Sequence, residues 1–409
     1  MILRTLLTRR SWFTWITLAL AVAGAPSRAD AGAALRKYET KYYILHTDLD
    51  RDMTRQAVVR ITAMAEEYRN RTRSFAGRIT ARFPLYLYKD REGYNRHPGA
   101  VRGSAGVYTG HALAATAPRP GGSWRVVQHE GFHQFAHRVI RGRLPVWLNE
   151  GLAEYFGYGV WTGDNLVVGL ISKGRLSALK EMIEDGKLMP LNKMLDMSRK
   201  EWNSELRSRN YLQAWSMVHF LVHADRGKYQ EALSQYIRDL SKGRSSSAAF
   251  GRRFGSNTQA FEICYSRWWT KLKDNPSAEL YDRIKVLTLT SCLARAWCTG
   301  RKFKDFNAFV AAVHDGTFDK VFVDIGRRNP VFWLPTSLLK RTLPPGDEAG
   351  RWSIPPKPAG RLIRYVRSDG STLVGGFSVG SRIKVKIRKI PPVSKKPTVK
   401  SGDKSASEK

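Results

Sequence analysis

Two histidines and a glutamate in the middle of the chain have the types and the spacing needed to bind a metal ion. His129 and His133 stand four residues apart in His129-Glu130-Gly131-Phe132-His133, so both imidazoles point to one side if the segment is a helix. Imidazole nitrogens bind zinc at about 2.0–2.1 Å. Glu150, seventeen positions after His133, is predicted to supply the third protein ligand that a catalytic zinc ion requires.

Glu130 lies one step round the helix from His129, beside the expected ion. From there its carboxylate can take a proton from metal-bound water, whose pKa zinc lowers to about 7. The predicted chemistry is therefore hydrolysis by zinc-activated water with Glu130 as general base. The alternative is an ordinary helix with a solvated His-Glu face, and it is opposed by the apolar neighbours Val126, Val127, Phe132 and Phe135.

Two helices must bring these side chains together. The first is predicted from Ser123, as its N-cap, to Arg141, before Gly142 and Pro145 interrupt the pattern. The second is predicted over 148–158 and carries Glu150. A turn between them would let the second helix pack against the first.

Segments before and after these helices have different patterns. Before them, alternating apolar residues predict a mixed sheet, with strands over 36–48, 83–88 and 101–117 and a helix over 50–72. After them, helical periodicity is found over 170–185, 190–197, 210–224, 230–240 and 254–273. Alternation returns over 361–365, 373–377 and 383–387, which predicts a small β module, and Val321–Ile325 is expected to form a further strand.

Composition divides the chain into successive parts. We expect a domain built around the histidine motif over 30–274, with a sheet subdomain (30–122) and a helical subdomain (123–274). A helical extension (275–343), a β module (344–390) that opens with a Pro-rich linker, and a disordered basic tail (391–409) follow.

The N-terminus indicates export. Residues 1–29 combine a basic start, an apolar run and Ser27-Arg28-Ala29, which predicts a signal peptide cleaved near Ala29 and a secreted, periplasmic or cell-envelope protein. Retention of this segment as a membrane anchor is the alternative, and no later segment is long and apolar enough to cross a bilayer. Export permits a disulfide among Cys264, Cys292 and Cys298, and unpaired thiols are the other reading.

The 409 residues carry a formal net charge of +34. Such a charge is typical of proteins that meet nucleic acid, an anionic membrane or an acidic polymer. Because the basic residues are scattered and no nucleic-acid-binding motif is present, nucleic acid is not favoured, whereas an anionic cell-envelope polymer remains a candidate partner.

Three further histidines, His137, His219 and His223, have a spacing similar to that of His129 and His133. His137 lies four residues beyond His133 and is expected to be packed or solvated rather than a ligand. His219 and His223 repeat the four-residue spacing, but Phe220 replaces the glutamate, so they are predicted to pack a helix, with a place in the wall of the site as the alternative.

The pattern His129-Glu130-x-x-His133, followed after fifteen residues by Asn149-Glu150-Gly151-Leu152-Ala153, resembles the gluzincin branch of the zincin metallopeptidases. The resemblance covers about residues 36–272 and is greatest to secreted gluzincin-like domains of unassigned substrate. It implies an α+β, zincin-like (thermolysin-type) fold with a mixed N-terminal sheet and a helical C-terminal lobe. The small β-rich C-terminal module would be an addition to it.

The same resemblance implies roles for other residues. Tyr211, in Asn210-Tyr211-Leu212, would donate a hydrogen bond to the oxyanion formed during hydrolysis. Glu154, one turn beyond Glu150, would orient a histidine ligand, and Gly106, Val107 and Tyr108 would form the edge strand that pairs with the substrate backbone. An ordinary core tyrosine, a solvated acid and a plain sheet strand are the alternatives.

The function expected from the sequence is an exported zinc metallopeptidase that cleaves a peptide or protein. Two other functions stay open: an inactive zincin-fold protein that binds the cell envelope, and a zinc hydrolase of a non-peptide amide or ester. No segment before His129 is typical of those that hold a free amino terminus, which favours an endopeptidase or a specialised peptidase.

Overall fold

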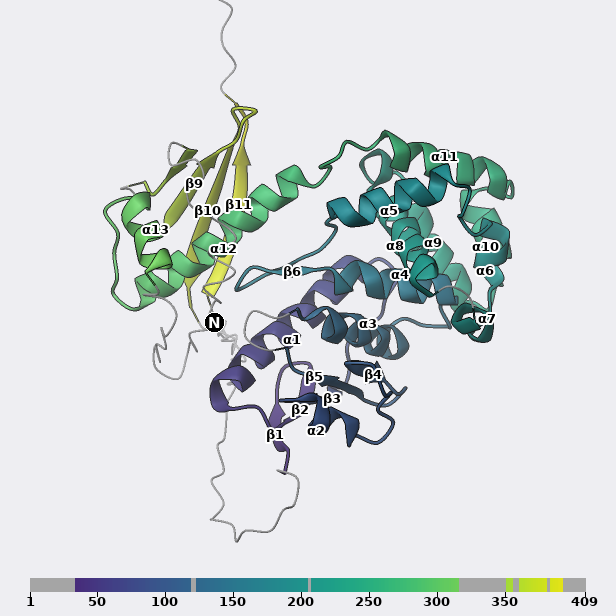
Figure 1. Ribbon diagram of the computed structural model, residues 1–409, viewed down its shortest axis with the longest axis horizontal. Helices are drawn as coiled ribbons and strands as arrows, with labels where there is room; N and C mark the ends of the chain where they lie inside the picture. The colour runs from purple at the N-terminus through teal and green to yellow at the C-terminus, as the bar shows by residue number, and fades with distance from the viewer. Residues whose placement is uncertain are drawn as a thin grey trace, which may run out of the picture. The chain divides into compact units, whose positions relative to one another are not determined.

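The computed structural model describes residues 34–118, 123–204, 207–315, 351–355, 360–380 and 383–392. In this part of the chain an N-terminal mixed sheet is followed by a helical region and then by an antiparallel sheet, so the expected α+β class is confirmed (Figure 1). The predicted signal peptide, the strand at Val321–Ile325 and residues 393–409 of the predicted tail lie outside the described residues.

The N-terminal sheet has five strands in the order β1-β2-β3-β5-β4. β3 pairs parallel to both β2 and β5, whereas β1 and β4 pair antiparallel to their neighbours and form the two edges. The single strand predicted over 36–48 is two strands, because the chain reverses at Thr40, whose hydroxyl accepts from the Tyr43 N–H at 2.9 Å. The strands are β1 (Arg36–Glu39), β2 (Tyr43–Thr47), β3 (Phe83–Tyr88), β4 (Gly106–Tyr108) and β5 (Leu113–Thr116).

Two helices accompany this sheet. Helix α1 (Arg51–Thr72) is capped by Asp50, whose carboxylate accepts from the Met53 N–H, and it buries the apolar face that its periodicity predicted. Helix α2 (Arg91–Asn95) is capped in the same way by Asp90.

The helices that carry the predicted ligands are α3 (Arg125–Val139) and α4 (Val146–Gly157). The predicted N-cap was wrong by one residue, because Trp124 occupies that position; the Ser123 hydroxyl still accepts from the Arg125 N–H at 3.2 Å. Helix α4 begins two residues earlier than expected, with Pro145 as its N-cap. Proline has no backbone N–H, and none is required at the start of a helix. Between them Gly142 has a φ of +79°.

Most of the region after α4 is helical. Helices α7 and α10 and the short hairpin β6–β7 were not predicted, because each of these elements is short. The elements are β6 (Val160–Trp161), β7 (Leu166–Val167), α5 (Lys173–Glu184), α6 (Leu191–Asp196), α7 (Arg199–Ser204), α8 (Arg207–His223), the 3-10 turn η1 (Ala224–Arg226), α9 (Gln230–Ser241), α10 (Ser246–Phe254) and α11 (Thr258–Lys271).

The last described elements form a small module of helix and sheet. Four antiparallel strands in the order β11-β10-β9-β8 pack on one long helix. The three predicted strands are confirmed, the first shifted by one residue and the other two longer than predicted. Gly375 lies so close to this helix that a Cβ there would collide with Thr290. The elements are α12 (Ala278–Cys298), α13 (Phe306–His314), β8 (Trp352–Ser353), β9 (Leu362–Val366), β10 (Thr372–Val379) and β11 (Ile383–Ile390).

All three cysteines are free thiols, so the disulfide pairings left open by the sequence are not formed. Of the described helices, none is both long and apolar enough to cross a membrane. The predicted domain boundaries stay predictions.

Candidate metal centre

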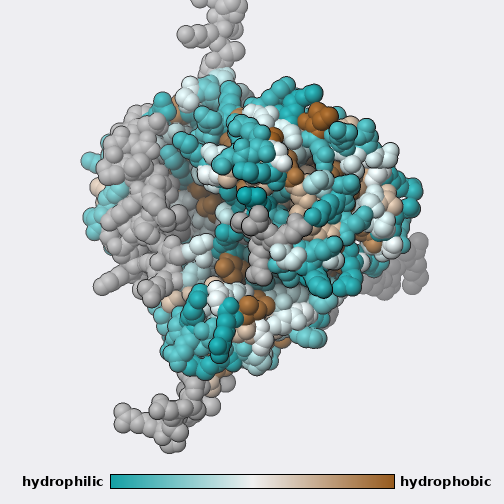
Figure 2. All heavy atoms as spheres, turned by 45° about the vertical axis from the view of Figure 1, so that its right-hand side comes forward, coloured by the Kyte–Doolittle hydropathy of each residue, from teal (hydrophilic) through white to brown (hydrophobic). Residues whose placement is uncertain are grey.

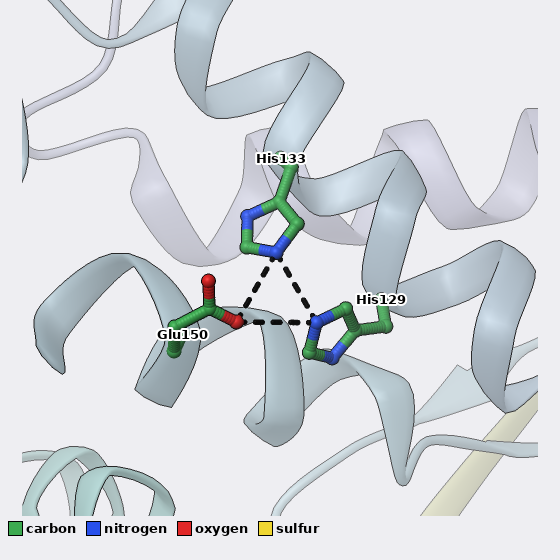
Figure 3. Close-up of side chains that lie close together, drawn as sticks. All are labelled: His129, His133 and Glu150. Carbon is green, nitrogen blue, oxygen red and sulfur yellow. Dashed lines mark hydrogen bonds and ion pairs between the residues drawn. The ribbon is translucent and has the colours of Figure 1, made fainter. Parts of the chain in front are cut away.

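His129, His133 and Glu150 converge on one point (Figure 3). The two Nε2 atoms are 3.1 Å apart, and Glu150 Oε2 lies 3.3 Å from His129 Nε2 and 3.4 Å from His133 Nε2. The three ligand atoms therefore form a nearly equilateral triangle. The histidine side chains are 13% exposed and the glutamate 3%, so the three ligands are largely shielded from solvent.

Packing on both sides of α3 and α4 fixes this triangle. Gly131, inside the histidine motif, lies against α1, where a Cβ would come within 2.8 Å of Met64. Gly151, next to Glu150, packs so closely on α8 that a Cβ would collide with the Ala214 carbonyl oxygen. Gln128 joins the two helices, since its side-chain amide donates to the Phe156 carbonyl at 3.0 Å. The glycines of the two motifs thus permit the helix contacts that bring the ligands together.

The donor set fits a metal ion. Tetrahedral ligands at about 2.0–2.1 Å from zinc stand about 3.4 Å from one another, close to the sides of the observed triangle. Glu150 Oε2, the oxygen that faces both imidazoles, is buried and has no hydrogen-bond partner. A buried carboxylate oxygen without a partner is costly, and a cation at the centre of the triangle would satisfy it.

Both imidazoles are oriented from behind. Asn149 Oδ1 lies 3.2 Å from His133 Nδ1, and Glu154 Oε1 lies 3.1 Å from His129 Nδ1. Each Nδ1 can therefore donate a hydrogen bond to an acceptor behind it, and in that tautomer the Nε2 lone pairs are left to face the shared point. The structure thus places Glu154 where the sequence predicted it, and it adds Asn149, which the prediction had not given this role.

Two arginines hold Glu154 in turn. Arg125 Nη2 donates to both carboxylate oxygens at 3.0 and 3.1 Å, and Arg175 Nη1 donates to Oε2 at 3.0 Å. The two guanidinium groups lie 4.2 and 4.0 Å from the centroid of the Tyr158 ring. Burial raises the pKa of Glu154, but the hydrogen bond with His129 and the charge of Arg125 outweigh it and bring the pKa to about 2.

A third arginine contacts the candidate ligand itself. Arg199 Nη1, at the start of α7, forms an ion pair with Glu150 Oε1, the oxygen that faces away from the imidazoles. This contact assigns the two oxygens of Glu150 different partners. The Arg199 side chain is 51% exposed, so its guanidinium group lies at the rim of the site. No spacing in the sequence connects Arg199 with the motif 49 residues earlier.

The buried ligands stabilise one another electrostatically. Burial raises the pKa of Glu150, yet the two histidines hold it well below its usual range. Burial lowers the pKa of His129, and the carboxylates of Glu150 and Glu154 beside its ring outweigh this effect and raise the pKa to about 9. Two acids thus stabilise positive charge at the point where the ligands meet.

Glu130 lies against the edge strand of the N-terminal sheet. Its Oε2 accepts a hydrogen bond from the Tyr108 backbone N–H at 2.9 Å, so the predicted segment Gly106–Tyr108 borders the predicted base. The Tyr108 hydroxyl lies 2.6 Å from His137 Nδ1. His137 therefore stands beside the strand and outside the ligand triangle.

Tyr211 on α8 faces the same site. Its ring centroid is 6.2 Å from that of His129, and its edge packs on Trp202 with a centroid distance of 5.5 Å. Burial, followed by the charge of Glu150, raises the pKa of Tyr211 to about 12. The phenol is therefore protonated at neutral pH and available as a donor.

His219 and His223 stand elsewhere in the core, as a packing role requires. Their rings are 4.4 Å apart at the centroids; His219 contacts Trp215 and Trp269, and His223 Nε2 lies 2.9 Å from the Tyr155 hydroxyl. Neither belongs to the candidate metal cluster.

Comparison with known proteins gives one family. Residues 124–244 match the family described as "Protein of unknown function (DUF1570)", a range that begins at the N-cap of α3 and contains all three candidate ligands. No curated protein matches the chain. The geometry of the His-His-Glu cluster is compatible with a zincin motif, and the family description assigns no activity.

Proposed function

We propose that this protein is an exported zinc peptidase of the gluzincin type. The observation that carries the proposal is the triangle of His129, His133 and Glu150 with a second carboxylate, Glu130, one helical step away. Two imidazoles and one carboxylate form a ligand set of catalytic zinc sites in peptidases. Export rests on the signal peptide predicted at residues 1–29.

A zinc ion held by the three ligands would acidify water and polarise a carbonyl group. Glu130 is positioned to accept the proton of the attacking water and to return it to the leaving nitrogen. The hydrogen bond from the Tyr108 backbone holds one of its oxygens, so the other remains available for this transfer.

Tyr211 would complete the site. It is protonated, partly buried and close to His129, so its hydroxyl can donate a hydrogen bond where negative charge develops during attack on a carbonyl group. The Trp202 ring packs against it and restricts its orientation. Tyr211 would therefore stabilise the transition state without a covalent bond to the substrate.

A peptide is the substrate class that the neighbouring strand favours. β4 is an edge of the five-stranded sheet, with β5 on one side only, and it borders Glu130. An extended peptide can add to such an edge through main-chain hydrogen bonds, and an ester without a peptide backbone cannot. The strand would therefore align the bond to be cleaved with the base.

The test removes the base and keeps the ligands. Glu130→Gln is expected to retain zinc, measured by elemental analysis, and to lower the cleavage of a peptide library by about 10²–10⁴-fold. Glu181→Gln, on the exposed face of α5, makes the same chemical change away from the site and should leave both measurements unchanged.

Parallel assays separate the rival functions. Full turnover by Glu130→Gln would contradict the assignment of the base. Zinc binding without cleavage of any peptide by the native chain would contradict the peptidase proposal and leave a binding protein. Chelator-sensitive turnover of ester or non-peptide amide substrates, with no peptide cleavage, would identify a hydrolase of another class.

A further inference from the structure

Helix α12 packs on one face of the C-terminal sheet, and none of the described helices packs on the other face, where Val374 is nevertheless buried. Gly375 and its cross-strand neighbours Ile363 and Ile387 lie on the α12 side, because a Cβ at Gly375 would collide with Thr290 of that helix. Side chains alternate along a strand, so residues at even-numbered positions near Gly375 project from the opposite face. We call this the outer face.

Four cations lie on the outer face. Lys384, Lys386 and Arg388 follow one another at every second position of β11, and Arg364 projects from β9; all four are exposed. The register places Arg364 and Arg388 on either side of Val374, on the two neighbours of β10. Successive cations along β11 are about 6.6–6.8 Å apart at the backbone, and Arg364 and Arg388 are about 10 Å apart.

No acid offsets these charges on the same face. Residues 360–392 include eight basic residues and a single acid, Asp369. Asp369 and Asp282 pair with Arg367 at 2.6 and 3.0 Å, and Glu279 pairs with Lys389 at 3.0 Å. Lys389 and Arg367 occupy odd-numbered positions, so these three acids form ion pairs with cations on the α12 side of the sheet and not with those on the outer face. The outer face is therefore a row of positive charge without a counter-ion among the described residues.

We propose that the outer face binds a linear polymer of phosphate groups that carries no bases. Repeated cations along one strand match repeated anions along an extended chain, and the multiple oxygens of a phosphate can accept from arginine and lysine on neighbouring strands. This surface is independent of the metal centre and goes beyond the proposed peptidase function.

Other polyanions fit the face less well. Proteins that bind single-stranded nucleic acid without sequence preference stack its bases on aromatic side chains, and no aromatic residue occupies an outward position of β9, β10 or β11. Interfacial membrane binding requires large apolar side chains that insert, whereas the exposed apolar residues here are Val366 and Ile390. Elsewhere on the molecule, on the side that Figure 2 presents, apolar residues form separate groups among hydrophilic ones.

The experiment uses the full chain and long-chain inorganic polyphosphate as the probe. One variant changes Lys384, Lys386, Arg388 and Arg364 to Gln. A control changes Arg69, Lys173, Arg267 and Lys271, exposed on α1, α5 and α11, to Gln and removes the same number of lysines and arginines. All eight positions are exposed, so circular dichroism and zinc content should match the native chain for both variants.

The outer-face variant is expected to bind polyphosphate about a hundredfold more weakly at low salt, while the control changes affinity by a few fold. For this variant the slope of the logarithm of affinity against the logarithm of salt concentration should also become shallower by about three, since fewer phosphates are neutralised. Equal weakening by both variants would overturn the proposal, because it would indicate general charge attraction. Tighter, outer-face-dependent binding of oligothymidylate, polygalacturonate or phosphatidylglycerol vesicles would overturn the assignment of the partner.

Discussion

Two pairs of histidines with the same four-residue spacing lie on helices α3 and α8, and they have opposite surroundings. His129 and His133 face two carboxylates, Glu150 and Glu154, and an amide from Asn149. His219 and His223 face aromatic rings, a tyrosine hydroxyl and the Gly169 carbonyl. The surroundings of the first pair stabilise a positive charge, and those of the second pair favour neutral rings. Accordingly, the pKa of His129 is raised to about 9 and the pKa of His223 is lowered to about 4.

The difference shows that a four-residue spacing of histidines is not sufficient to form a metal centre. What separates the pairs is the supply of acids from α4, whose Glu150 and Glu154 contact the histidines of α3. The glutamate inside the first motif has its counterpart in Phe220, which is buried among Tyr229, Phe261 and Tyr265. Each prediction below alters one side of this comparison.

The largest effect is expected from completing the motif at the second pair. Phe220→Glu creates the sequence pattern of the first pair, but it removes a core ring and buries a charge without a partner. Together these changes cost roughly 5 kcal/mol or more, comparable with the whole stability of a domain. Urea unfolding should show a largely unfolded chain, whereas the control Phe220→Leu should remain folded. A folded variant with a second equivalent of zinc would break the comparison.

A smaller effect is expected from acid. Burial, followed by the charge of Arg71, lowers the pKa of His223 to about 4, whereas the ordinary value is about 6.5. The unfolded chain therefore binds the proton first, and stability falls as pH drops from about 6.5 to about 4, by about 3 kcal/mol. Urea midpoints measured over this pH range with chelator present should show this loss of stability. In His223→Gln the loss should be smaller. An identical pH dependence in native chain and variant would contradict the account.

The smallest effect concerns the acid behind the first pair. Glu154→Gln removes a charge that orients His129 and pairs with Arg125 and Arg175, so zinc affinity should fall by about 10–100-fold. Competition with a chromophoric chelator measures this change. As a control, Glu184→Gln on the exposed side of α5 should leave the affinity unchanged. An unaltered affinity in Glu154→Gln would show that the acids of α4 do not distinguish the two pairs.

Much of the candidate site could be predicted from sequence because its information is local. His129 and His133 share one helix, and Glu150 and Glu154 share another, so helical periodicity alone placed each pair on one face. The edge strand 106–108 and Tyr211 came from resemblance, and the structure places both at the site. The strands of the C-terminal module were predicted from their alternation.

The remaining features depend on long-range packing. Arg175 and Arg199 reach the site from helices 21 and 49 residues beyond their partners, and nothing in their local sequence indicates an ion pair. The chain between 36 and 48 reverses at a turn closed by backbone and side-chain hydrogen bonds between Thr40 and Tyr43, which the alternation of apolar residues does not reveal. Helix α10 is short, and its Phe250 ring packs on rings from α9 and α11, a contact that its own sequence does not reveal.

The most direct test of the account is the zinc content of two matched variants of the purified chain, His133→Gln and His223→Gln. Each replaces the second histidine of a pair by the same polar amide. The account predicts about one equivalent of zinc per native chain and per His223→Gln chain, and a loss of at least about tenfold in zinc affinity for His133→Gln. Full zinc retention by His133→Gln, or equal loss from both variants, would contradict it.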